Sequence, residues 1–140
     1  IKDFRWIEGV IEALKILKEN NFLIIVISNQ SGVARGYFSE QDVHNLHKWI
    51  NIQLSEHNIS IDDFFFATEL PNTEISKTRR KPSPKMIEEA IVKYNLNRDD
   101  CFMIGDKDID VLAAKNAKIR GFLFEGGNLS YKIKKILNIT

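Results

Sequence analysis

The stretch Cys101–Asp110, with the sequence CFMIGDKDID, decides the predicted fold of this chain. Its first four residues are apolar and lead to Gly105, and aspartates then follow at Asp106, Asp108 and Asp110. A short apolar run that ends in a glycine and a polar turn is typical of a strand covered on both faces in a parallel sheet. We therefore expect a buried strand that leads directly into a helix.

Apolar runs and amphipathic segments alternate along the rest of the chain in the same way. Apolar residues at helical spacing predict helices at about 7–19, 39–57, 84–94, 109–115 and 129–137. Short runs rich in β-branched or aromatic residues predict strands at about 23–27, 64–67, 101–104 and 119–124. This alternation indicates a three-layer, Rossmann-like α/β fold, in which a parallel sheet lies between layers of helices.

The composition favours a small soluble protein. With 140 residues, 44% of them hydrophobic, the chain can form one compact core, so we expect a single domain over 1–140. The 20 lysines and arginines against 19 aspartates and glutamates leave a net charge of +1, which argues against nucleic acid or a membrane as partner. The single cysteine, Cys101, excludes an internal disulfide and a cysteine zinc site. We therefore expect a soluble, cytoplasmic protein in which any binding is local, and we expect it to be a monomer.

Polar residues follow the first predicted strand, at the position where ligands bind in open α/β sheets. They are Ser28, Asn29, Gln30, Ser31 and Gly32. Hydroxyl groups, side-chain amides and exposed backbone N–H groups suit the oxygens of a phosphate. An ordinary turn is the alternative, because serine, asparagine and glycine are favoured in turns. Taken by itself, this segment leaves both interpretations open.

A basic segment precedes the predicted third helix. It consists of Arg79, Arg80 and Lys81 and is followed by Pro82. A guanidinium can bind two phosphate oxygens at once, and an ammonium acts as a compact charge against an anion. A solvated basic loop is the alternative interpretation.

The acidic segment after the strand at 101–104 gives the sharpest signal. The carboxylates of Asp106, Asp108 and Asp110 would repel one another unless a cation offset their charge. Magnesium fits this position, because it prefers oxygen ligands and is often held by one or two carboxylates together with a phosphate. The alternative is that Asp108 caps the helix and Asp110 lies in its favourable first turn.

Together, the three segments resemble the second, third and fourth motifs of the haloacid dehalogenase-like (HAD) superfamily of phosphatases. The matching features are Ser28 at a strand end, Lys81-Pro82 ahead of a helix, and Met-Ile-Gly-Asp-x-x-x-Asp at 103–110. The longer segments SNQSGVARG at 28–36 and RKPSPKM at 80–86 resemble D-glycero-D-manno-heptose 1,7-bisphosphate phosphatases and their relatives, the histidinol-phosphate phosphatases. The similarity covers nearly all of the chain.

The resemblance implies roles for the residues around the phosphoryl group. Ser28 would donate a hydrogen bond to the transferring phosphoryl group, and Asn29, Gln30 and Ser31 would line the substrate site. Lys81 would neutralise the phosphoryl group and orient the nucleophile. Ser28 and Lys81 are therefore the expected catalytic residues.

The resemblance also implies a metal site and further substrate contacts. Asp106 would bind Mg²⁺, and Asp110 would support that site without touching the metal. Arg80 would grip the substrate at its second phosphate, and Lys107 would face the substrate. The expected cofactor is therefore Mg²⁺.

The activity that the resemblance implies is that of a magnesium-dependent phosphomonoester hydrolase with an aspartyl-phosphate intermediate. The first expected substrate is D-glycero-D-manno-heptose 1,7-bisphosphate of cell-envelope lipopolysaccharide synthesis, and the second is histidinol phosphate. A catalytically inactive phosphate-binding or interaction domain is an alternative of another class. A receiver domain of the response-regulator kind shares the α/β plan but does not explain the segment from Ser28 to Gly36.

The first motif of the superfamily, Asp-x-Asp at the end of the first strand, has no match in this sequence. It supplies the nucleophile and the acid/base aspartate, whereas Asp3 is the only acidic residue before Glu8 and follows no apolar strand. We therefore expect the nucleophile on a strand upstream of Ile1, in the middle of the sheet. Without that strand the chain would have two exposed strand edges, a split core and no phosphatase turnover.

Zinc is not expected. Many relatives bind zinc in the segment that corresponds to Thr68–Arg80, but here that segment has no cysteine or histidine. The three histidines, His44, His47 and His57, fall on the helix predicted at about 39–57. His44 and His47 share a helix face and could hold a metal, but surface or half-buried positions are the better interpretation.

Overall fold

The computed structural model describes residues 6–74 and 77–139, which form two compact units. Unit 1 comprises the described residues of Ile1–Ile25, Gln41–Asp63 and Gly126–Thr140. Unit 2 comprises Val26–Glu40 and the described residues of Phe64–Glu125. The single domain expected over 1–140 stays a prediction. Asp3 lies outside the described residues.

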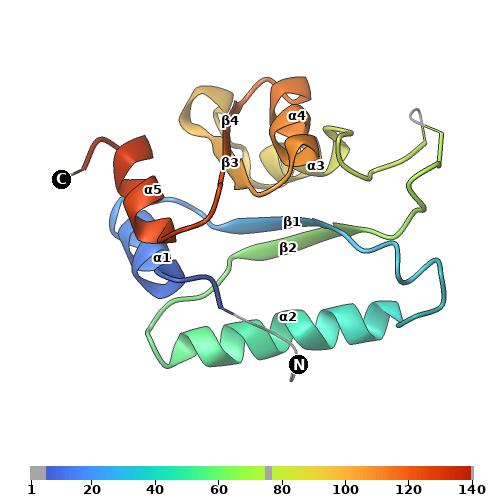
Figure 1. Ribbon diagram of the computed structural model, residues 1–140, viewed down its shortest axis with the longest axis horizontal. Coiled ribbons are helices and arrows are strands. Elements are labelled where there is room, and N and C mark those ends of the chain that lie inside the picture. The colour runs from blue at the N-terminus through green and yellow to red at the C-terminus, as the bar shows by residue number, and fades with distance from the viewer. Residues whose placement is uncertain (1–5, 75–76, 140) are drawn as a thin grey trace. The chain divides into compact units, whose positions relative to one another are not determined.

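Helices and strands alternate along the described chain (Figure 1). The helices are α1 (Val10–Glu19), α2 (Glu40–Ser55), α3 (Lys85–Tyr94), α4 (Asp108–Asn116) and α5 (Leu129–Ile136), with a short 3₁₀ helix at Arg98–Asp100. The strands are β1 (Ile25–Asn29), β2 (Asp63–Ala67), β3 (Phe102–Gly105) and β4 (Arg120–Leu123). The predicted helices and strands are confirmed, with bounds that shift by a few residues.

The four strands pair two by two. β1 lies beside β2, and β3 lies beside β4 (Figure 1). The second pair is parallel, with Phe102 opposite Arg120 and Gly105 opposite Leu123, as predicted. β1 and β3 are not hydrogen-bonded to each other, so within the described residues each strand has an unpaired edge.

The strands are less buried than their apolar sequences suggest. All five residues of β1 and all four of β3 are only half-buried. A strand becomes fully buried when both faces are covered and both edges are paired, and here each of these strands has one neighbour. The unpaired edge of each strand accounts for this lower burial.

The core of unit 2 joins two helices to the strands. Buried residues of α3 and of the end of α4 form a cluster, against which half-buried residues of β1 and β3 pack: Ile87, Ile91, Ala113, Ala117, Ile27 and Met103. Gly121 lets β4 approach α4 closely, because a Cβ at this position would lie only 2.9 Å from the Cβ of Ala114. This cluster anchors β1 and β3, whose carboxyl ends carry two of the polar segments described above.

Unit 1 is built on the packing of α1 against α5. Ala13 of α1 and Ile133 of α5 are completely buried. Ser130 Oγ donates a hydrogen bond of 3.2 Å to a carboxylate oxygen of Glu12, and Lys134 Nζ lies 3.3 Å from the other oxygen. None of the helices in residues 6–74 and 77–139 has the length and the apolarity that a membrane crossing requires.

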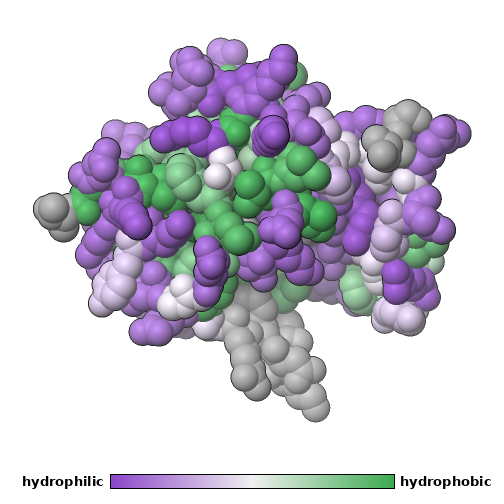
Figure 2. Space-filling model, turned by 45° about the horizontal axis from the view of Figure 1, so that its top comes forward, coloured by the Kyte–Doolittle hydropathy of each residue, from purple (hydrophilic) through white to green (hydrophobic). Residues whose placement is uncertain are grey.

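Some large apolar side chains stay at the surface. The most exposed are Tyr37, Val92, Tyr131 and Ile52. Figure 2 shows one face of the molecule, on which apolar side chains lie among polar ones. Single exposed apolar residues are normal for a folded protein, so they indicate no particular binding surface.

Candidate active site

Three polar segments of unit 2 meet around Lys81. They are the carboxyl end of β1, the loop that precedes α3, and the turn from β3 into α4. We call the group formed by Lys81, Asn29, Asp110 and the carbonyl of Ile27 the Lys81 site. Hydrogen bonds between these segments span 29 to 54 residues of sequence, so tertiary packing assembles the site.

The Lys81 ammonium is buried and paired. Its Nζ donates to Asp110 Oδ1 at 2.5 Å and to the carbonyl oxygen of Ile27 at 3.1 Å. The two charged side chains are only 11% and 7% exposed. Because removing one partner would leave the other charge buried and unpaired, such a pair holds both groups firmly in place. The ammonium is therefore fixed beside the carbonyl of Ile27, directly before Ser28 on β1.

The backbone of Lys81 is held as well. Asn29 Oδ1 accepts a hydrogen bond of 2.9 Å from the Lys81 N–H, and Asn29 Nδ2 donates one of 3.3 Å to the Lys81 carbonyl. Asn116 Nδ2 at the end of α4 donates to the carbonyl of Pro82 at 3.0 Å. The Lys81-Pro82 peptide bond is cis. Side-chain amides thus support two successive residues of this loop.

Asp110 is a structural centre of the turn after β3. Its Oδ2 accepts a hydrogen bond of 3.1 Å from the Lys107 N–H at the start of α4, while Oδ1 accepts from Lys81. Gly105 leaves room for this carboxylate, because a Cβ there would lie 2.4 Å from the Cβ of Asp110. The carboxylate that caps α4 is therefore that of Asp110, and the alternative that Asp108 caps the helix is wrong.

Asp106 and Lys107 follow β3 and have exposed side chains. Within the described part of the chain, the Asp106 carboxylate makes no hydrogen bond and no ion pair, whereas that of Asp110 is fully engaged. The described residues contain no group of three metal-ligating side chains of the His, Cys, Asp or Glu type. One free carboxylate fits Mg²⁺, which keeps several waters and takes one or two carboxylates plus phosphate oxygens.

The two arginines of the basic loop differ in the contacts of their side chains. Arg79 Nε and Nη2 donate to the two oxygens of Glu89 at 2.7 and 2.8 Å, and Nη1 donates to the carbonyl of Phe66 at 2.9 Å. The hydrogen bond to Glu89 raises the pKa of the Arg79 guanidinium above its ordinary value. Arg80 has no side-chain partner among residues 6–74 and 77–139. Only Arg80 is therefore available to a ligand.

The segment after β1 is a compact turn. Gln30 Nε2 donates to Ser28 Oγ at 3.3 Å, and the Gln30 N–H donates to the carbonyl of Ala67 at 2.7 Å. The Arg35 N–H donates to the carbonyl of Ser31 at 3.1 Å. Ser28 and Ser31 stay half-buried. The structure thus places Ser28 next to Asn29 and to the carbonyl of Ile27, at the edge of the Lys81 site.

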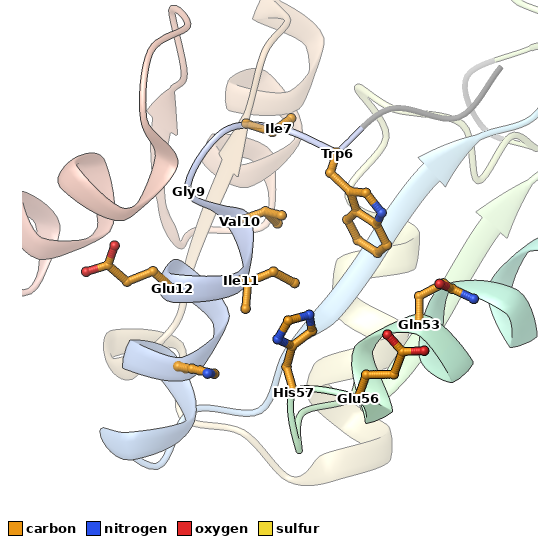
Figure 3. Close-up of a pocket in the computed structure, with 10 residues that line it drawn as sticks. Trp6, Ile7, Gly9, Val10, Ile11, Glu12, Gln53, Glu56 and His57 are labelled. Carbon is orange, nitrogen blue, oxygen red and sulfur yellow. The ribbon is translucent and has the colours of Figure 1, made fainter. Parts of the chain in front are cut away.

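The histidines lie elsewhere. His47 is buried on α2, whereas His44 and His57 are exposed. Burial, and secondarily the charge of His44, lowers the pKa of His47 below its ordinary value. His57 lines a hollow of unit 1 together with Trp6, Gln53 and residues of α1 (Figure 3). None of the predicted site residues lines this hollow.

Sequence reasoning missed two features of the Lys81 site. It did not assign a partner to Lys81 and did not mention Asn116. The spacing of Asp106 and Asp110 by four residues at a helix start gave the one available signal, because it places Asp110 back over the strand end. The contacts of Asn29 and Asn116 had no signal in the sequence.

Comparisons with known proteins identify the family. A family model described as HAD-hydrolase-like matches residues 78–134. The D-glycero-beta-D-manno-heptose-1,7-bisphosphate 7-phosphatase of Rhodopseudomonas palustris is 38% identical in an alignment of 138 positions that covers 95% of this chain and 77% of that protein. The protein of the same name from Pasteurella multocida is 37% identical in an alignment of 124 positions that covers 86% of this chain and 67% of that protein.

A solved structure agrees in fold. The crystal structure of D,D-heptose 1,7-bisphosphate phosphatase from B. bronchiseptica, complexed with magnesium and phosphate, matches with a TM-score of 0.77. The match has 24% identity and covers 94% of this chain and 72% of that one. It confirms the predicted α/β fold of the HAD type. The chain therefore belongs to the HAD-like hydrolases, in the family of the heptose-1,7-bisphosphate 7-phosphatases.

Proposed function

We propose that the protein hydrolyses a phosphate ester of a small metabolite in a magnesium-dependent reaction, with D-glycero-D-manno-heptose 1,7-bisphosphate as substrate. The names of its relatives support this substrate. The observation that carries the proposal is the Lys81 site, in which a buried carboxylate and a carbonyl hold an ammonium beside the polar end of β1. Phosphoryl transfer depends mainly on such positioning and on the stabilisation of charge.

In this proposal the Lys81 ammonium neutralises the transferring phosphoryl group, and Ser28 donates a hydrogen bond to it. The nucleophile is the aspartate of the first HAD motif, which has no match in this sequence; its carboxylate attacks phosphorus, and the bond to the ester oxygen breaks. The leaving oxygen takes a proton from the acid/base aspartate. Water then attacks the aspartyl-phosphate and releases inorganic phosphate. Gln30 and Ser31 line the substrate site from the turn after β1.

Asp106 is the proposed magnesium ligand from this chain. Its carboxylate is exposed at the end of β3 and has no partner within the described residues. When bound there, Mg²⁺ would offset negative charge on the phosphoryl oxygens. Asp110 supports the site indirectly, because it fixes Lys81 and the start of α4.

Arg80 and Lys107 are the proposed contacts for the second phosphate of the substrate. Arg80 directly precedes Lys81, and Lys107 lies three residues before Asp110. The guanidinium of Arg80 has no partner within the described residues. A guanidinium can bind two oxygens of one phosphate, which suits a substrate with two phosphate groups. Arg79 is excluded from this role by its bonds to Glu89 and Phe66.

The test is phosphate release by the full-length gene product from heptose 1,7-bisphosphate, with histidinol phosphate as the competing substrate. We expect release with Mg²⁺ and none after chelation. Lys81→Ala should lower kcat by at least about 10²-fold, as the loss of one charge-stabilising group commonly does. Asp106→Ala should abolish the magnesium-dependent release of phosphate.

Matched controls come from exposed residues of the same types. Lys48→Ala and Asp99→Ala remove side chains that are exposed and have no role in the Lys81 site, so both variants should retain full activity. Full activity of the Lys81 or Asp106 variant would contradict the assigned roles. A full-length protein that binds phosphate without turnover would instead support a non-catalytic phosphate-binding domain.

We also propose that the protein acts as a cytoplasmic monomer with a small phosphorylated metabolite as its ligand, without nucleic acid or membrane partners. The small net charge of +1 supports this proposal. Light scattering of the full-length protein at several concentrations tests the oligomeric state, and a mass that rises with concentration would refute it.

A further inference from the structure

The side-chain amide of Asn29 makes two hydrogen bonds to one residue, Lys81. Its Oδ1 accepts from the Lys81 N–H at 2.9 Å, and one Nδ2–H donates to the Lys81 carbonyl at 3.3 Å. A primary amide offers two donor hydrogens and two acceptor lone pairs, so one N–H and one lone pair remain. The amide therefore pairs with both polar backbone groups of Lys81 at once.

We infer that Asn29 is a positioning residue for Lys81 and that it affects the reaction through the Lys81 ammonium. This inference rests on the proposed function, in which Lys81 contacts the phosphoryl group. Asn29 lies in β1 directly after Ser28, so its amide ties the loop of Lys81 to the end of the strand that carries the proposed phosphoryl donor.

The contacts of the ammonium show why the backbone position matters. Nζ reaches Ile27, two residues before Asn29 on the same strand, and Asp110 at 2.5 Å. A lysine side chain has four rotatable bonds, so both of its ends must be held before its charge occupies one place. Asn29 holds the backbone end, while the Ile27 carbonyl and Asp110 hold the charged end.

Unit 1 contains the same pair of hydrogen bonds, made to the backbone of an uncharged residue. Asn51 Oδ1 accepts from the Ile61 N–H at 2.7 Å, and Asn51 Nδ2 donates to the Ile61 carbonyl at 3.1 Å. Asn51 is therefore a matched control. Its loss removes two similar hydrogen bonds, but no residue of the Lys81 site depends on it.

The experiment compares Asn29→Ala, Asn29→Asp and Asn51→Ala in the full-length protein by two measurements. The first is the rate at which acetic anhydride acetylates Lys81, followed by mass spectrometry of the peptide that contains it. The second is kcat and KM for heptose 1,7-bisphosphate. We expect Asn29→Ala to raise the acetylation rate about tenfold, because two hydrogen bonds that hold the loop are lost.

The same variant should lower kcat by about 10²-fold with little change in KM, because a misplaced catalytic group costs turnover more than binding. Asn29→Asp keeps the acceptor for the Lys81 N–H and should give intermediate values. If Asn29→Ala fails to fold, the acetylation rate of Asn29→Asp decides. Asn51→Ala should leave both the Lys81 acetylation rate and kcat unchanged.

The outcomes separate this inference from the proposed function. Unchanged acetylation of Lys81 in both Asn29 variants overturns the inference, even if the enzyme is active. A lower kcat with unchanged acetylation also overturns it, because Asn29 would then act on the substrate directly. Faster acetylation in a full-length protein without phosphatase activity supports the positioning of Lys81 by Asn29 and refutes the phosphatase assignment.

Discussion

Two asparagines in different units of the molecule make the same pair of hydrogen bonds. In unit 1, Asn51 binds the N–H and the carbonyl of Ile61 at 2.7 and 3.1 Å. In unit 2, Asn29 binds the same groups of Lys81 at 2.9 and 3.3 Å. The difference lies in the residue that is held: Ile61 is an apolar residue with 8% exposure, whereas Lys81 carries a charge paired with Asp110.

The comparison shows that the effect of such a backbone contact depends on the side chain of the residue that it holds. At Ile61 the amide satisfies polar groups near the apolar core, which contributes to the stability of unit 1. At Lys81 an equivalent amide also sets where an ammonium lies. Changes near Lys81 should therefore alter both stability and activity, and changes near Ile61 should alter stability alone.

The largest effect is expected from Gly105→Ala. A Cβ at this position would lie 2.4 Å from the Cβ and Oδ2 of Asp110, so the carboxylate must move away from Lys81. Overpacking of this kind costs roughly 1–3 kcal/mol. We expect that loss in urea unfolding, together with faster acetylation of Lys81. The double variant Gly105→Ala/Asp110→Gly, which also removes the Cβ at position 110, is the control, and purely additive losses in it would show that the clash is not with Asp110.

Asn51→Ala should have the next largest effect, on stability alone. It leaves the N–H and the carbonyl of Ile61 without their side-chain partner, and a buried polar group without a partner costs about 1–3 kcal/mol. Urea unfolding measures this loss, and kcat of the full-length protein should equal that of the wild type. A fall in kcat larger than the loss of folded protein would show that Asn51 also affects activity, and the two asparagines would then not differ in role.

A smaller effect is expected where Arg79 meets Glu89. Their side chains are 37% and 42% exposed, so solvent weakens the pair despite its two short hydrogen bonds. Glu89→Gln should lower the free energy of unfolding by roughly 0.5 kcal/mol, and less at high salt. Arg80→Ala should leave unfolding unchanged and raise KM for a bisphosphate. Equal stability losses in both variants would show that Arg80 also has a structural partner.

The alternation of helices and strands could be predicted because apolar periodicity is local information. The order of Ser28, Lys81 and Asp106 at strand and helix ends also indicated one site, since strand ends in α/β sheets lie at one edge. Helix starts were less certain: Ser83 and Pro84 predicted an earlier start than Lys85, where α3 begins, although Ser83 Oγ does accept from the Lys85 N–H at 3.3 Å.

The partners of individual polar side chains could not be predicted. Arg79 and Arg80 are adjacent and chemically identical, and only the positions of Glu89 and of the Phe66 carbonyl separate them. The family resemblance predicts that Asn29 lines the substrate site, but nothing in the sequence indicated the bonds of its amide to a residue 52 positions away. Burial was overestimated for β1 and β3, because an apolar run does not reveal whether both edges of a strand are paired.

The smallest effect is expected from the titration of His47, which tests whether unit 1 responds to pH independently of the Lys81 site. Burial lowers the pKa of His47 below its unfolded value of about 6.5, so the unfolded chain binds the proton more readily than the folded one. Stability should therefore be complete above about pH 6.5 and should decline as the pH falls below it. Thermal unfolding between pH 8 and pH 5 should show this decline in the wild type and a flatter profile in His47→Gln, while His57→Gln, at an exposed position, should follow the wild type.

Because Lys81 acetylation depends on contacts within unit 2, the ratio of its rates in His47→Gln and wild type should stay the same across this range. A ratio that changes with pH would show that the charge on His47 reaches the Lys81 site, and the two units would then have to be treated as one electrostatic system.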